Sequence, residues 1–246
     1  MIFLLILFNF APSAYFTIGN GLYPNYTLSG YISFINQDRY IFLGYERYYE
    51  ENFRQNLISI GLGRSLINRL YLRTILIGYQ NNLENRGLVF TTRTYYGINP
   101  WYSLGCFYTL YSQNIPSGQR FYWIAHLNPE VNYIINKLRF LPCFTFGLVY
   151  TKNLDGDYFV GVGKVKVNVI SPLFLEVGGF YGQTYHFIDD QSVLVCNRLN
   201  LQKAKFNIKL EYVLFNKLHL IGAITKNVFS RYNINYGTFG ISYQSK

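Results

Sequence analysis

The chain has 246 residues, of which half are hydrophobic and a fifth aromatic, while only 14% are charged against about 25% in an average soluble domain. Such a chain must keep much apolar surface away from water, either in a protein core or in lipid. The formal net charge of +10 comes from Lys and Arg dispersed along the sequence without a basic run, so we expect no nucleic-acid partner.

The N-terminal segment is almost wholly apolar from Met1 to Phe10 and continues into Ala11-Pro12-Ser13-Ala14. Cleavage after Ser13 would leave small residues at both selective positions of a signal-peptidase site. We therefore expect residues 1–13 to be a signal peptide and residues 14–246 to form one mature domain. A buried first strand is the alternative explanation for the same residues.

A short turn pattern recurs along the rest of the chain, where no stretch reaches the roughly 18 apolar residues of a membrane-spanning helix. In this pattern an apolar run is followed by Asn or Ser, then Lys, Arg or Pro, then another apolar run. It occurs at 67–70, 98–101, 135–138, 170–173 and 215–218, and in a looser form at 36–38. The spacing leaves room for two strands of about ten residues and one connection between successive turns.

Polar segments lie between these turns and are predicted to be longer loops, at 50–55, 80–86, 113–119, 152–157, 183–191 and 227–233. Short turns that alternate with longer loops are typical of outer-membrane barrels. The sequence therefore predicts an all-β fold, a transmembrane antiparallel up-and-down β-barrel. Five turns with both termini on the periplasmic side give 12 strands, which we favour, and the turn near Asn36 would give 14.

Alternation of apolar and polar residues supports this fold in three segments, 123–133, 159–169 and 206–214. In a membrane barrel one face of each strand meets lipid and the other meets the lumen. The polar faces predict a lumen lined by His126, Asn128, Glu130, Arg73, Arg139, Lys164, Lys166, Lys205, Lys209, Glu176 and Glu211. The basic excess favours a narrow channel or binding barrel for small polar or anionic solutes, but the charges could equally pair across strands and plug the barrel.

A catalytic site is the alternative from another functional class, because His186 lies near Asp189 and Asp190. A histidine beside carboxylates can act as an acid/base pair, and outer-membrane proteases resemble such an arrangement. The chain has no Gly-x-Ser-x-Gly, His-Glu-x-x-His or phosphate-loop spacing. We therefore expect a protein without enzymatic activity and keep an outer-membrane hydrolase or lipid-modifying enzyme as the alternative.

The three cysteines show no metal-binding spacing, and we expect neither a metal nor another cofactor. Cys106 and Cys143 each follow a predicted turn by seven residues. This spacing predicts similar heights on two strands that are separated by a third, too far apart for a disulfide.

The C-terminal residues Thr238, Gly240 and Tyr243 resemble the signal by which Gram-negative outer-membrane proteins are recognised by the barrel-assembly machinery, although Ser245 stands where an aromatic residue is expected. Together with the turns and strands, this resemblance covers nearly the whole chain. It implies export through the inner membrane, an outer-membrane location and contact with membrane lipid and lipopolysaccharide. The length and the Tyr-rich segment Gly44-Tyr45-Glu46-Arg47-Tyr48 resemble YaiO-type barrels. A plugged structural or assembly barrel is a further alternative.

Overall fold

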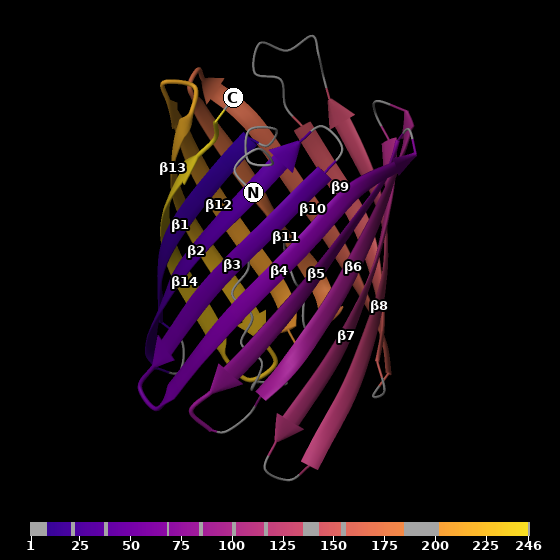
Figure 1. The fold of residues 1–246 in the computed structure, drawn as a ribbon, viewed down its shortest axis with the longest axis vertical. Helices are drawn as coiled ribbons and strands as arrows, with labels where there is room; N and C mark the ends of the chain where they lie inside the picture. Colours follow the sequence, from indigo (N-terminus) through magenta and orange to yellow (C-terminus); the bar gives the residue numbers. More distant parts are fainter. Residues whose placement is uncertain are drawn as a thin grey trace, which may run out of the picture.

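The computed structural model describes residues 9–20, 23–36, 39–67, 69–83, 86–99, 102–115, 118–134, 143–153, 156–184 and 202–245. These residues form a closed barrel in which every strand runs antiparallel to its neighbours in the sequence, and the first strand pairs with the last. Figure 1 shows the tilted strands, with the start of β1 and the end of β14 at the same end of the barrel. No helix among these residues is long and apolar enough to cross a membrane.

The described residues contain fourteen strands. In chain order they are β1 Asn9–Asn20, β2 Pro24–Asn36, β3 Arg39–Glu50, β4 Phe53–Ile67, β5 Leu70–Asn81, β6 Arg86–Asn99, β7 Tyr102–Ile115, β8 Gly118–Ile134, β9 Cys143–Asn153, β10 Gly156–Ile170, β11 Leu173–Thr184, β12 Gln202–Leu214, β13 Leu218–Phe229 and β14 Asn233–Tyr243.

The favoured count of 12 strands is wrong, and the alternative of 14 describes the structure. The difference arises at the looser turn, because β2 ends at Asn36 and β3 begins at Arg39, with these two residues paired in register. Four of the five clearer turns also lie between strands, and Arg69 and Asn216 there have positive φ angles of 75° and 57°. The fifth, at 135–138, lies outside the described residues.

The predicted difference between short turns and long loops is wrong at most of the loop positions. Only two residues separate β3 from β4, β7 from β8, and β9 from β10. The polar residues assigned to loops instead continue the strands, so that Arg54 and Gln55 pair with Tyr49 and Tyr48. Strands of 11 to 17 residues exceed the roughly ten that span an outer membrane, and their polar ends account for the apparent loops.

The segment Asn9–Ser13, part of the predicted signal peptide, lies in β1 and pairs with β2 from Asn9↔Ile35 to Ser13↔Tyr31. The backbone amide of Phe10 donates a hydrogen bond of 2.6 Å to Ser245 Oγ, and this hydroxyl donates one of 2.9 Å to the Phe10 carbonyl. Cleavage after Ser13 would remove these contacts from the barrel. The cleavage itself stays a prediction.

Alternation along each strand separates an outer from an inner face. Outward side chains are mainly large and apolar, such as Ile58, Leu62 and Ile224, each at least 60% exposed. Inward tyrosines lie over glycines: Tyr15, Tyr31, Tyr79 and Tyr236 stand opposite Gly240, Gly44, Gly87 and Gly19. Each ring occupies the space that a side chain would need if the glycine were replaced by a larger residue. Two of these pairs close the seam between β1 and β14, with the Thr17 and Thr238 hydroxyls 3.0 Å apart between them.

The two cysteines predicted at similar heights are far apart along the barrel wall. Cys106 pairs with Leu127 of β8, whereas Cys143 pairs with Ile134. Seven positions on β8 correspond to about 23 Å at about 3.3 Å per residue. The equal-height expectation is wrong because the connection between β8 and β9 spans residues 135–142 and delays the start of β9.

This register predicts that Cys106 and Cys143 remain free thiols, since bridging requires Cα atoms within about 7 Å. Mass spectrometry of peptides from unreduced, alkylated protein should find both cysteines modified. A peptide that joins the two residues would contradict the pairing of β8 with its neighbours.

Candidate lumenal site

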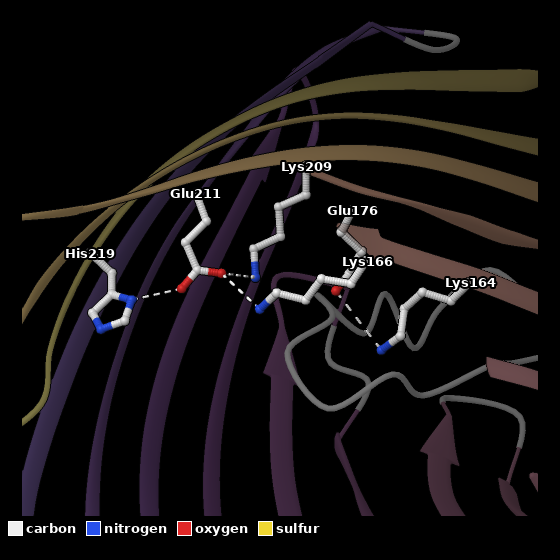
Figure 2. Close-up of polar contacts among 6 residues, drawn as sticks. All are labelled: Lys164, Lys166, Glu176, Lys209, Glu211 and His219. Carbon is white, nitrogen blue, oxygen red and sulfur yellow. Dashed lines mark hydrogen bonds and ion pairs between the residues drawn. The ribbon is translucent and has the colours of Figure 1, made fainter. Parts of the chain in front are cut away.

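The inner faces of β10 to β13 carry a connected group of charged residues, which we call the lysine ladder. It consists of Lys164, Lys166, Glu176, Lys209, Glu211 and His219. Strand register places them on one face, because Lys166 pairs with Glu176 and Glu176 pairs with Lys209. Figure 2 shows their side chains extending from neighbouring strands toward one another in a row.

Glu211 is the centre of the ladder. Its Oε2 lies 3.4 Å from Lys166 Nζ and 3.7 Å from Lys209 Nζ, and its Oε1 lies 2.6 Å from His219 Nδ1 (Figure 2). At the far end Lys164 Nζ is 3.9 Å from Glu176 Oε2. One carboxylate thus holds two lysines and a histidine from three strands, which fixes the lysines along the wall.

The ladder exposes its cations more than its anions. The side chains of Lys164 and Lys166 are 48% and 40% exposed, whereas those of Glu176 and Glu211 are 19% and 14% exposed. Three lysines against two carboxylates also leave a net positive charge with His219 neutral. This wall therefore presents positive charge to the interior even though its lysines are paired.

Two other predicted lumen residues are placed by the structure. Lys205 follows the inward alternation of β12 and stands opposite Phe180. Arg73 lies on β5, away from the ladder strands, where its guanidinium carbon is 4.7 Å from the Tyr40 ring centroid and its Nη2 donates to the Tyr40 hydroxyl. The predicted set is therefore divided between two walls.

The remaining predicted residues cannot be assigned to the site. The backbone of His126, Asn128 and Glu130 lies in β8, while their side chains are outside the described part. Arg139 and the candidate catalytic residues His186, Asp189 and Asp190 also lie outside the described residues. Among the described residues, no three His, Cys, Asp or Glu side chains gather to hold a metal ion.

The opposite wall, formed by β2 to β6, contains inward residues that the sequence analysis missed. Glu46 is 6% exposed and accepts a hydrogen bond from the Tyr31 hydroxyl at 2.5 Å. Arg93 is 7% exposed and stands opposite Arg73 in register. Alternation from the correct turn at Asn36 would have placed Glu46 inward together with Tyr40 and Phe42. Unlike the ladder, this wall is largely buried, and its buried residues include both apolar or aromatic side chains such as Phe42 and polar ones such as Gln55.

Comparisons of the fold identify outer-membrane β-barrels. The CymD monoaromatic hydrocarbon channel aligns with a TM-score of 0.59 and 9% identity over 97% of this chain and 88% of its own. A bacterial polysaccharide outer membrane secretin aligns with a TM-score of 0.56 and 8% identity, over 98% of this chain and 99% of its own. Omp33 of Acinetobacter baumannii aligns with a TM-score of 0.54 and 8% identity, over 97% of this chain and 98% of its own. No family model matches the chain, and no curated protein sequence matches it. The chain thus has the fold of an outer-membrane β-barrel.

Proposed function

We propose that this protein is an outer-membrane channel that conducts small polar solutes and favours anions, without enzymatic activity. The protein is exported through the inner membrane, assembled by the barrel-assembly machinery, and oriented with both termini in the periplasm. The fold supports this placement, since an apolar outer surface on a closed barrel suits a bilayer. The YaiO-type subfamily, for which the comparisons give no support, stays a prediction.

The unequal exposure of the lysine ladder is the observation that carries the anion preference. A solute in the lumen meets the ammonium groups of Lys164 and Lys166 before the carboxylates that partner them. Rings or rows of accessible lysine favour anions in a pore, because the local potential concentrates them and opposes cations. The pairs with Glu176 and Glu211 weaken this potential but do not reverse its sign.

Planar-bilayer recording in a KCl gradient should therefore give a reversal potential that indicates chloride preference. The double substitution Lys164→Glu and Lys166→Glu changes the formal lumen charge by four units and should reverse the sign of that potential. Lys226→Glu is the matched control, since Lys226 is exposed on the outer face of β13 and its replacement should leave selectivity unchanged.

A cation preference of the wild-type protein would contradict the proposal. So would a double variant that folds to a heat-modifiable barrel and keeps chloride selectivity. The second result would mean that Lys164 and Lys166 do not face the conducting path.

The buried wall of β2 to β6 favours a second candidate, a closed structural barrel. Tyr48, Gln55 and Val89 point inward yet are at most 1% exposed, so this wall is not open to a wide lumen. Absence of current from folded protein would favour this candidate. The catalytic alternative at His186, Asp189 and Asp190 stays a prediction, tested by His186→Ala in an activity assay.

A further inference from the structure

A second charged feature lies on the outer surface, toward the end of the barrel opposite the termini. Along the outer face of β4, exposed aliphatic residues such as Ile58 and Ile60 give way to Asn56 and Arg54. On β3 the same change runs from Leu43 through Tyr45 to Arg47 and Tyr49. A lipid-facing wall thus ends in tyrosine, arginine and asparagine, as expected where hydrocarbon gives way to headgroups.

Ring stacking fixes part of this region. The rings of Tyr26 and Tyr49 stack with centroids 4.6 Å apart and planes at 17°. The guanidinium carbon of Arg47 lies 4.7 Å from the Tyr49 centroid. The face of the guanidinium is therefore occupied by a ring, while its N–H edges can still donate to an oxygen acceptor.

Arg54 adds a second cation beside the same ring, because it stands opposite Tyr49 in the register of β3 and β4. Next to it the Tyr45 hydroxyl donates to Asn56 Oδ1 at 3.1 Å, which leaves the amide N–H groups of Asn56 as donors. We call Tyr26, Arg47, Tyr49, Arg54 and Asn56 the arginine patch.

The charge of the arginine patch has no counter-charge in the described part of the chain. Neither Arg47 nor Arg54 forms an ion pair there. Glu46 and Glu50 are buried on the inner face of β3, and Glu51 in the adjoining turn is exposed without an ion pair to either arginine. Two exposed guanidinium groups at the edge of an apolar surface attract anionic headgroups.

We infer that the arginine patch binds a phosphate group of lipopolysaccharide. Arginine forks suit phosphate oxygens, and stacked tyrosines offer an apolar face to the sugar that carries the phosphate. The choice of lipopolysaccharide over a glycerophospholipid rests on the proposed function, which places the termini in the periplasm and this end of β3 and β4 in the outer leaflet.

Native mass spectrometry of the full-length protein in detergent tests this site with three probes, namely bisphosphorylated lipid A, dephosphorylated lipid A and phosphatidylglycerol. Bisphosphorylated lipid A should bind most tightly. The double variant Arg47→Gln and Arg54→Gln should bind it about tenfold more weakly, since each loses charge-assisted hydrogen bonds. Tyr49→Leu keeps both charges but removes the stacking platform, and should weaken binding roughly threefold.

Lys226→Gln is the matched control, because Lys226 is also exposed on the outer face near this end, on β13. The affinity of this variant for bisphosphorylated lipid A should match that of the wild type. Unchanged affinity of the double arginine variant, or equal loss in Lys226→Gln, would overturn the site. Equal binding of dephosphorylated lipid A would show that the patch does not recognise the phosphate group. Equal binding of phosphatidylglycerol would show that lipopolysaccharide is not the specific ligand. Lipid binding that follows the expected pattern in a protein without conductance would contradict only the channel.

Discussion

A Gly240→Val variant should refold into the closed barrel much less efficiently than the wild type. Gly240 of β14 stands opposite Tyr15 of β1, and the Tyr15 ring occupies the position that a side chain at 240 would take. Overpacking at a tight contact typically costs about 1–3 kcal/mol. At this seam the cost falls on the one strand pair that joins the ends of the sheet, so we expect the yield of refolded barrel to fall clearly below that of the wild type.

Refolding of urea-unfolded protein into detergent micelles, followed by the heat-dependent shift on a gel, measures this effect on the purified chain alone. Gly237→Val is the matched control on the same strand, since a side chain there meets nothing within 4 Å. The double variant Tyr15→Ala with Gly240→Val should recover folding. Normal refolding of Gly240→Val alone would show that the ring does not occupy this space.

Glu211→Gln should destabilise the barrel more than any other single change in the lysine ladder. It leaves Lys166, Lys209 and His219 without their shared carboxylate. Loss of a hydrogen-bonded, mostly buried charge partner costs about 1–3 kcal/mol, and the lumen should also become more selective for anions. The urea concentration at the midpoint of unfolding in lipid vesicles measures the first effect.

Glu176→Gln is the natural comparison, because among the described residues Glu176 has one ion pair, of 3.9 Å, with a lysine that is 48% exposed. Such pairs contribute less than about 1 kcal/mol, so the midpoint should shift only slightly. Equal shifts for the two variants would mean that Glu211 is not the centre of the ladder.

The sequence predicted the barrel and its turns because these depend on local signals. Period-two alternation placed Lys164 and Lys166 on one face of their strand and Val165 and Val167 on the other. Asn followed by Lys or Pro indicated the hairpin turns. The strand count failed at Asn36, where the turn lacks the clearer pattern. Loop lengths failed because polar residues such as Arg54 suit a strand that extends beyond the lipid as well as they suit a loop.

Alternation indicated the polar strand faces that carry Lys164, Lys166, Glu176, Lys209 and Glu211, but it did not predict their ion-pair partners. Alternation indicates a face, whereas an ion pair such as Lys166 with Glu211 depends on the register of strands 45 residues apart in sequence. Glu46 was missed because the looser turn at Asn36, which precedes its strand, was not included in the favoured strand count. The arginine patch was missed for another reason: outward charges contradict a simple lipid-facing strand, and only the position of Arg47 and Arg54 near the strand ends explains them.

The short connections determine where the chain can be altered without disturbing its hydrogen-bonded wall. At the end opposite the termini, six of the seven links between strands hold two to four residues, and only the link between Thr184 and Gln202 is long. Insertions are tolerated where they interrupt no ladder, and a hairpin link of two residues offers no such place. An epitope tag, a fluorophore site or a displayed peptide at any of these six short links is therefore expected to disturb the pairing of the strands on either side.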